Sequence, residues 1–221
     1  MSYKEIRANG KGSYTDFGLA IKNRTISLPK KKTIKEDIPF SNGSYDFSNI
    51  NGEIYWEERE IEYTFDIAEF TAEEMEKIKD DVVDWLLNIH DADIEDDYTK
   101  DYYYHGSYDD NGWSEDFGQG ELKIIFVVYP YKFAKSLTTK TISATTTEQT
   151  IVINNDGSHK IIPTISTDGA VEITIGANTY SLSSGTYTSS SFVLSKGENT
   201  WTIKTTTDTA NVNISFRKEV F

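Results

Sequence analysis

Residues 61–67, Ile-Glu-Tyr-Thr-Phe-Asp-Ile, hold the clearest structural pattern in this 221-residue chain. Ile61, Tyr63, Phe65 and Ile67 alternate with polar or charged residues, so they occupy one face of an extended backbone. Such alternation predicts a β-strand with one face in a core and the other in solvent.

A helix is predicted directly after this strand. Thr71 and Glu74 have the spacing of a capping box, in which each side chain bonds to the backbone N–H of the other residue. Phe70 and Met75 are placed to form a hydrophobic staple across the helix start. We therefore expect a helix over about 71–90 that packs on a sheet. Apolar residues recur through it at helical spacing: Met75, Ile78, Val82, Trp85, Leu86 and Ile89.

The segment Leu122–Tyr129, LKIIFVVY, is almost continuously apolar. Such a run is typical of a strand that is covered on both faces. Pro130 follows it and lacks a backbone donor, so we expect this proline to limit the continuation of the strand.

A hairpin is predicted nearer the N-terminus. Ser41-Asn42-Gly43 supplies turn residues between two short strands, Ile34–Pro39 and Ser44–Phe47. We expect this hairpin to project from the body of the domain.

The composition changes near residue 136. From there onward, 31 of the 86 residues are Ser or Thr. The stretch Ser136–Thr147, SLTTKTISATTT, has no aromatic residue and little charge, which is typical of an extended linker or edge segment. We expect one domain over 1–135, a linker over 136–147 and a second domain over 148–221.

The second domain contains short runs that favour β-structure, separated by turn residues such as NNDG, TDG and KGEN. Strands at this spacing indicate a small β-sandwich. The fold class is therefore mainly β: a β-rich α+β domain with one principal helix, followed by a sandwich. The expected strands are Ile151–Asn154, Ile161–Ser166, Ala170–Ile175, Asn178–Leu182, Ser191–Leu194, Thr200–Thr205 and Ala210–Phe216.

The chain is strongly acidic, with 22 Lys+Arg, 36 Asp+Glu and a formal charge of −14. A negative field of this size repels phosphate backbones and anionic lipid, so we expect neither a nucleic-acid nor a membrane partner. The one basic cluster, Lys30-Lys31-Lys32 with Lys35, is interpreted as a solvated turn.

The absence of cysteine rules out disulfides, thiolate metal sites and cysteine nucleophiles, and it fits a reducing compartment. No apolar run reaches the roughly 18 residues needed to span a bilayer. The N-terminal residues MSYKEIRANG lack the apolar core of a secretion signal, so we expect a soluble protein made in a cytoplasm.

Sequence patterns for catalysis and metal binding are missing. The acidic run that begins at Asp91 resembles a calcium loop, but Asp96 and Tyr102 stand where an EF-hand needs Gly and Glu. No nucleophile elbow or phosphate-binding loop is present. We expect no catalytic residue, no metal site, no cofactor and no enzymatic activity. None of the three histidines has paired-ligand spacing: His90, His105 and His159.

Two further hypotheses are weighed against an assembly role. A carbohydrate-binding module that recognises host cell-wall polysaccharide would use Tyr187 and Trp201, because sugars stack on exposed aromatic rings. Trp201 shares a strand face with Ile203, however, and this alternation points it into the core. A wall-degrading enzyme would need two carboxylates about 5–9 Å apart, and nothing selects such a pair among the acidic residues.

Several segments, in this order, resemble the distal tail (Dit) protein family of long-tailed (siphovirus) bacteriophages or prophages of Gram-positive bacteria. They are NGKGSYTDFGLAIKNR (Asn9–Arg24), PKKKTIKEDIPFSNGSYDFS (Pro29–Ser48), GEIYWEEREIEYTFDI (Gly52–Ile67), GELKIIFVVYPYKF (Gly120–Phe133) and KGENTWTI (Lys196–Ile203). The sequence departs from the family at the hairpin tip, where Phe40-Ser41-Asn42-Gly43 replaces Gly-Arg-Asp-Gly. No contact of that arginine is carried over.

The resemblance implies a split-barrel-like, ring-forming N-terminal domain and a galectin-like C-terminal sandwich. Six copies would close into a ring at the distal end of the virion tail, assembled in the bacterial host cytoplasm. As a hub, this ring would join the tail tube to the tip or baseplate. It would contact the tail-tube protein and a tail-associated or tail-tip protein, and in some phages a receptor-binding protein.

The hairpin is our candidate for the segment that reaches a neighbouring copy in such a ring. When identical chains bind head to tail and the rotation between neighbours closes a ring, each sheet edge at the interface is covered by the next copy. The candidate interface residues are Ile38, Phe40, Tyr45 and Phe47.

Overall fold

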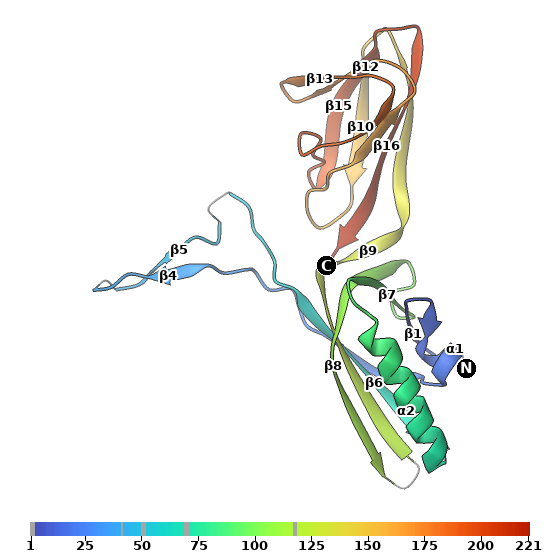
Figure 1. The fold of residues 1–221 in the computed structure, drawn as a ribbon. Coiled ribbons are helices and arrows are strands. Elements are labelled where there is room, and N and C mark those ends of the chain that lie inside the picture. The colour runs from blue at the N-terminus through green and yellow to red at the C-terminus, as the bar shows by residue number, and fades with distance from the viewer. Residues whose placement is uncertain (1–2, 41, 50–51, 69–70, 117–118) are drawn as a thin grey trace. The chain divides into compact units, whose positions relative to one another are not determined.

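The computed structural model describes residues 3–40, 42–49, 52–68, 71–116 and 119–221. It divides into two compact units, unit 1 with Met1–Lys132 and Phe221, and unit 2 with Phe133–Val220 (Figure 1). Strands dominate both units, so the predicted mainly β class is confirmed. No helix within the described residues is long and apolar enough to cross a membrane.

Unit 1 is built on one sheet with the strand order β3-β6-β9-β8-β7-β1-β2, and β9 continues into unit 2. Two short strands, β4 (Lys35–Asp37) and β5 (Ser44–Asp46), pair only with each other. The strands of the sheet are β1 (Ile6–Ala8), β2 (Lys11–Gly12), β3 (Ile21–Ile26), β6 (Arg59–Ala68), β7 (Ala92–Asp96), β8 (Tyr102–Asp116) and β9 (Gln119–Thr145).

The predicted alternation in β6 is confirmed. Ile61, Tyr63 and Phe65 are fully buried, and they face the core together with the even-numbered residues of β9 from Leu122 to Val128. β6 pairs with both β3 and β9 in antiparallel register, with Tyr63 opposite Ile124. The strand is therefore central, and its buried side chains define the core of unit 1.

The predicted helix is α2 (Ala72–Leu87), which lies along the sheet (Figure 1). Its capping box is present: the Thr71 hydroxyl accepts from the Glu74 N–H, and the Glu74 carboxylate accepts from the Thr71 N–H. The Trp85 indole N–H donates to the Ala8 carbonyl at 3.0 Å, which joins the helix to β1. A short helix, α1 (Ser13–Phe17), packs nearby through the Phe17 and Trp85 rings. Phe70, the other half of the predicted staple, lies outside the described residues.

One prediction about β9 is wrong. The strand runs through Pro130, because its pairing with β6 ends at Val128 and no N–H of residue 130 is needed on that side. It also runs through most of Ser136–Thr147, the segment predicted to be an extended linker or edge segment. Residues 136–145 are strand, and Ile142 and Ala144 are buried in the core of unit 2.

A glycine fixes the close approach of β8 to β9. A Cβ atom on Gly106 would lie 2.2 Å from the Val127 carbonyl oxygen and 2.6 Å from the Val128 Cα. Both neighbours are backbone atoms, so no side-chain rotation can make room. Only glycine fits at this position.

Unit 2 is a sandwich of two sheets, with strand orders β14-β11-β16-β9 and β10-β15-β12-β13. Side chains from both sheets form its core, including Ile165, Val212 and Trp201. The predicted strand Ser191–Leu194 is reduced to a single bridge between Leu194 and Ile161. Phe192 and Leu194 are nevertheless buried in the core. The strands proper to unit 2 are β10 (Gln149–Asn155), β11 (Thr164–Thr167), β12 (Val171–Ile175), β13 (Asn178–Leu182), β14 (Gly185–Thr188), β15 (Gly197–Thr205) and β16 (Thr209–Val220).

A buried carboxylate ties three strands of unit 1 together. Asp96, at the end of β7, is 1% exposed. Its Oδ2 accepts from the Arg24 guanidinium of β3 at 2.7 Å and from the Tyr63 hydroxyl of β6 at 2.6 Å. Its Oδ1 accepts from the N–H groups of Tyr98 and Thr99 and from the Thr99 hydroxyl. Burial opposes the charged form, but the bonds from Tyr63, Arg24 and Thr99 lower the pKa of Asp96.

We expect Asp96→Asn to lower the free energy of unfolding by about 3–5 kcal/mol, because it leaves the Arg24 charge without its buried partner. Urea unfolding followed by tryptophan fluorescence measures this loss. In the unaltered chain, Asp96 contributes fully to the free energy of unfolding at pH values above the pKa that it has in the unfolded chain. This contribution is lost as the pH falls through the lower pKa that Asp96 has in the folded chain.

The matched control is Asp66→Asn, since Asp66 makes an exposed ion pair with Lys22. Its removal should cost less than about 1 kcal/mol. Equal losses in the two variants would contradict a structural role for the buried carboxylate.

Candidate functional site

The predicted hairpin is present, and we call residues 34–47 the arm. Lys35, Glu36 and Asp37 of β4 lie opposite Asp46, Tyr45 and Ser44 of β5, and the Phe47 N–H donates to the Ile34 carbonyl. The segment before the arm and the segment after it are also paired, through the antiparallel bridge between Lys31 and Trp56. The arm is thus an outward continuation of the β3–β6 pair (Figure 1).

The two faces of the arm differ. Directly opposed residues of an antiparallel pair share a face, and so do residues two apart on one strand. One face therefore carries Ile34, Tyr45 and Phe47 with Glu36 among them, and the Tyr45 and Phe47 ring centroids are 6.2 Å apart. The other face is polar: Lys35, Asp37, Ser44 and Asp46.

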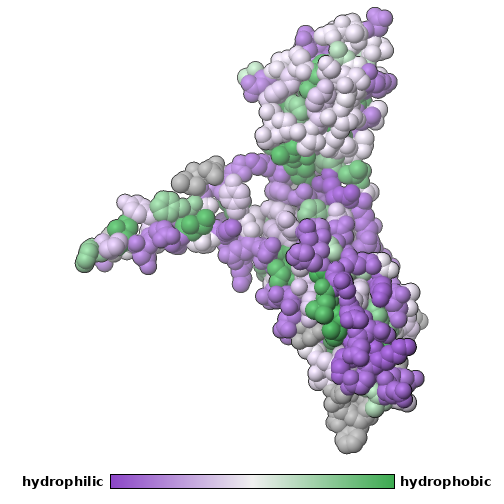
Figure 2. Space-filling view, in the orientation of Figure 1, coloured by the Kyte–Doolittle hydropathy of each residue, from purple (hydrophilic) through white to green (hydrophobic). Residues whose placement is uncertain are grey.

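The described residues of the arm are exposed, apart from the half-buried Ile38. Tyr45 is 62% exposed, Phe47 39%, and Phe40 is completely exposed at the tip. Figure 2 shows this hydrophobic surface as green atoms on the extended segment. Phe40 also has a φ of 64°, which is unusual for a bulky residue. An aromatic ring held outward in a strained conformation indicates a contact surface.

Of the four predicted interface residues, Phe40, Tyr45 and Phe47 are exposed and Ile38 is half-buried. Ser41, the first residue of the predicted turn, lies outside the described residues. Gly43 has a φ of 99°, the left-handed conformation that favours glycine in a turn. The structure brings Tyr45 and Phe47 together on one face and holds Phe40 apart at the tip.

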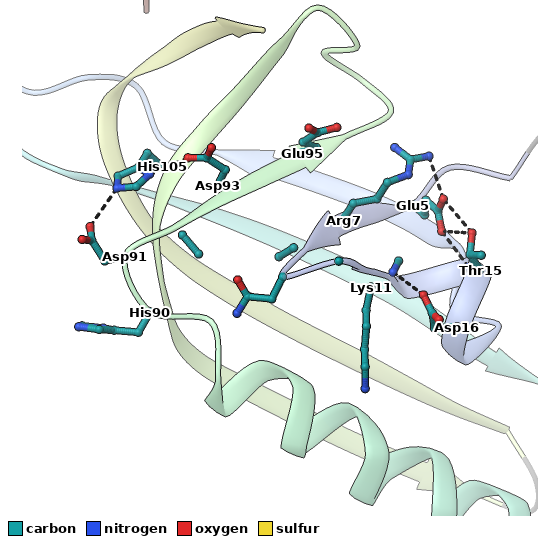
Figure 3. A pocket seen from close by; sticks show the side chains of 15 residues that line it. Glu5, Arg7, Lys11, Thr15, Asp16, His90, Asp91, Asp93, Glu95 and His105 are labelled. Carbon is teal, nitrogen blue, oxygen red and sulfur yellow. Dashed lines mark hydrogen bonds and ion pairs between the residues drawn. The ribbon is translucent and has the colours of Figure 1, made fainter.

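An open groove of about 750 Å³ lies beside β1 and β7 (Figure 3). His105 spans two carboxylates in it, with Nδ1 2.8 Å from Asp93 and Nε2 2.9 Å from Asp91. The hydrogen bond with Asp93 raises the pKa of His105; burial opposes the shift and Asp91 adds to it. Asp91 has a φ of 48°, in the left-handed region that is uncommon for residues other than glycine. The residues form an ion-pair clamp.

The acidic run that resembled a calcium loop is dispersed. Asp91 and Asp93 face His105, Asp96 is buried and Asp97 pairs with Arg7. Among the residues that the structure describes, no group of three His, Asp or Glu side chains is arranged to hold a metal ion.

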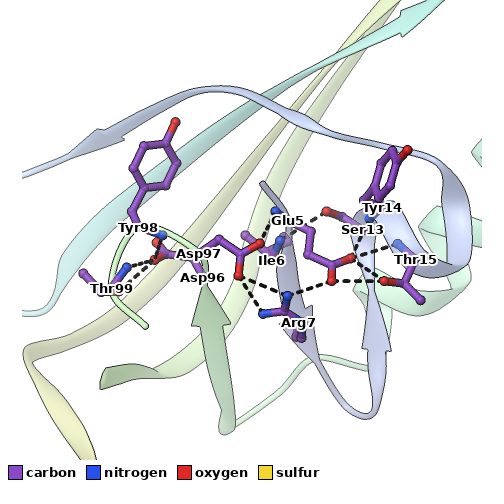
Figure 4. Close-up of polar contacts among 10 residues, drawn as sticks. All are labelled: Glu5, Ile6, Arg7, Ser13, Tyr14, Thr15, Asp96, Asp97, Tyr98 and Thr99. Atoms are coloured by element: carbon purple, nitrogen blue, oxygen red, sulfur yellow. Dashed lines mark hydrogen bonds and ion pairs between the residues drawn. The ribbon is translucent and has the colours of Figure 1, made fainter. Parts of the chain in front are cut away.

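A second charged network, which none of the predicted elements covered, lies at the edge of this groove (Figure 4). The Glu5 carboxylate accepts from the backbone N–H groups of Tyr14 and Thr15 and from the Thr15 hydroxyl, and so caps α1. Arg7 joins Glu5 to Asp97. Burial raises the pKa of Glu5, but the bonds from Thr15 and the charge of Arg7 outweigh it, so the pKa is lowered. The alternation of Glu5 and Arg7 with apolar neighbours is the one signal that could have indicated a strand here.

The sugar-site candidates are poorly placed for ligand stacking. Trp201 is 2% exposed in the core of unit 2, so it cannot stack on a sugar. Tyr187 is partly buried against the same core, and its hydroxyl donates to the Ser183 carbonyl. The alternation of β15 points the Trp201 ring into the core, as its place on one strand face with Ile203 predicted.

We expect Asp93→Asn to lower the pKa of His105, because the variant removes the carboxylate that contributes most to the upward shift. NMR titration of the His105 ring measures the change. In the unaltered chain, the stabilisation from the clamp is complete below the unfolded histidine pKa of about 6.5. It is lost as the pH rises through the higher folded pKa. An identical His105 titration in both proteins would contradict the clamp, and signals from unit 2 should not differ between them.

No protein-family model matches the chain, and no curated protein matches it in sequence. Among solved structures, it is similar to the SPP1 Dit (gp 19.1) protein, described as a paradigm of the hub adsorption apparatus in phages that infect Gram-positive bacteria. The TM-score is 0.69 and the identity 15%, over 98% of this chain and 99% of that chain.

The chain is also similar to a chain of the phage p2 baseplate in its activated conformation with Sr. That likeness has a TM-score of 0.44 and 9% identity over 97% of this chain and 98% of that chain, and it is too weak to indicate a shared fold. The similarity to the SPP1 protein spans nearly the whole of both chains. The chain therefore has the fold of the SPP1 Dit protein, as the resemblance of its sequence to the distal tail family implies.

Proposed function

We propose that this chain is a structural subunit of a bacteriophage tail that assembles as a hexameric ring. The ring acts as a hub at the distal end of the virion tail, where it joins the tail tube to the tip or baseplate. It anchors the tail-tip or receptor-binding proteins there. Its partners are other copies of itself, the tail-tube protein and the tail-associated protein, and it has no catalytic role.

The observation that carries this proposal is a fold shared over 98% of the chain with the hub protein of SPP1. The arm adds physical support, because Tyr45 and Phe47 on its aromatic face remain exposed to solvent among the residues that the structure describes. A hydrophobic face of this kind is stabilised when a second protein covers it. A head-to-tail contact through such an arm closes into a ring when the rotation between copies is suitable.

The alternative, a wall-polysaccharide-binding module, would have to bind sugar without stacking on Trp201. Trp201 belongs to the core of unit 2, and Tyr187 is partly covered. Unit 2 is therefore proposed as a peripheral domain of the hub that contacts proteins, with the galectin-like architecture that the family resemblance implies.

We expect the purified chain at high concentration, alone or with a tail-tip protein, to form rings of about 150 kDa from six 25.1 kDa chains. Multi-angle light scattering measures the mass, and electron microscopy shows the ring. A chain that stays monomeric in both conditions, and does not bind the tail-tip protein, would contradict the proposal.

Phe40→Asn should weaken ring formation without unfolding the chain. Asparagine tolerates the left-handed conformation at position 40, so the backbone is kept while the exposed ring is removed. We expect the free energy of unfolding of the monomer to change by less than about 0.5 kcal/mol, as for other exposed positions. Val152→Asn is the matched control, because Val152 is an exposed apolar residue of unit 2 that should not affect the ring. Equal assembly by both variants would count against the arm as the contact.

A further inference from the structure

Four cationic side chains of unit 1 lie over tyrosine rings, and two of them, Lys4 and Arg24, share the ring of Tyr98. Arg24 of β3 lies over Tyr98 at 4.4 Å from its Cζ to the ring centroid. The other two contacts are slightly longer: Arg59 of β6 lies 5.5 Å from the Tyr104 centroid, and Lys132 of β9 lies 5.3 Å from the Tyr102 centroid. We call Arg24, Arg59 and Lys132 the cation cluster. Its members lie close enough for their charges to act on one another.

Among the residues that the structure describes, one carboxylate acts on this cluster of three positive charges. That carboxylate is Asp96, and its two oxygens already accept five hydrogen bonds, from Arg24, Tyr63, Tyr98 and Thr99. Arg59 makes no hydrogen bond or ion pair with any described residue, although it is only 7% exposed and its Nε is fully buried. Lys132 likewise has no ion-pair partner among the described residues.

A buried guanidinium without an anion is costly, because it loses water and gains only the weak attraction of a ring face. Burial and the neighbouring positive charges lower the pKa of both Arg59 and Lys132. An arriving anion would remove this cost. The guanidinium presents parallel N–H groups that match a carboxylate in a two-point contact, and an ammonium beside it adds a third donor.

The most suitable anion is a carboxylate on a protein. A nucleic acid would meet the field of a chain with a formal charge of −14, which repels a long run of phosphates. A single carboxylate brings one negative charge and, on a protein, can be flanked by apolar groups. Such flanking groups would suit the tyrosine rings that surround the cluster.

The arm carries such a carboxylate. Glu36 is exposed between Ile34, Tyr45 and Phe47, and it makes no hydrogen bond or ion pair with any described residue. If this face is covered by a neighbour, as the proposed ring requires, the Glu36 charge is removed from water and needs a cation. The arm and the cation cluster thus carry complementary unpaired charges.

We infer that Glu36 of one copy binds Arg59 and Lys132 of a second copy when the apolar face of the arm docks. This inference rests on the proposed self-assembly, and it names the charged residues that fix how the arm of one copy is aligned on its neighbour. Asp37, the adjacent acidic residue, lies on the opposite face and takes no part.

The chain has no cysteine, so introduced cysteines are unique and can report the contact. We would mix Glu36→Cys with Lys132→Cys protein and add a short bismaleimide cross-linker. We expect a cross-linked dimer in the mixture that neither variant gives alone. Asp37→Cys mixed with Lys132→Cys is the matched control and should cross-link several-fold less.

Charge reversal gives a second readout, by light scattering. Glu36→Lys should weaken association roughly 30-fold or more, Lys132→Glu should do the same, and a chain carrying both changes should recover assembly. Asp37→Lys should assemble like the unaltered chain. Rings that form normally with Glu36→Lys, without the specific cross-link, would overturn this inference and leave the proposed function intact. A chain that neither oligomerises nor cross-links at any concentration would overturn both.

Discussion

The fold of unit 1 depends on one buried ion pair, between Asp96 and Arg24. A carboxylate in this position is tolerated only because Arg24, Tyr63 and the turn at Thr99 satisfy both of its oxygens. The pair fixes β3, β6 and β7 in one register. It also occupies the one carboxylate that the described residues place near the cation cluster, so among those residues Arg59 and Lys132 contact aromatic rings and no anion. The same contact that holds the strands together therefore leaves two cations available for the contact that we propose with a second copy.

Local patterns predicted the elements whose determinants lie close together in sequence. The capping box at Thr71 and Glu74 located the start of α2, and the alternation after Ile61 located the buried face of β6. The course of β9 could not be predicted in this way. Its passage through Pro130 depends on where β6 ends, and its continuation through residues 136–145 depends on pairing with β16, far along the chain.

In the candidate site, too, features with local determinants could be predicted from the sequence and features that depend on distant strands could not. The exposed aromatics of the arm follow from a short turn between two strands, so the sequence was sufficient to locate Tyr45 and Phe47. The isolation of Arg59 could not be predicted, because it depends on three strands bringing cations together and on Asp96 being already occupied. In the sequence, Arg59 is one residue among many charged neighbours between Glu57 and Glu62.

The position of Glu36 has a consequence for symmetry. Two arms could in principle cover their apolar faces by stacking on each other in an isologous dimer, which would end growth at two copies. That arrangement would bring a carboxylate from each arm into one dry interface, where like charges repel. A single acidic residue at the centre of the apolar face of the arm thus disfavours the isologous dimer. In the ring that we propose, the contact would instead be heterologous, and every copy would both give and receive an arm.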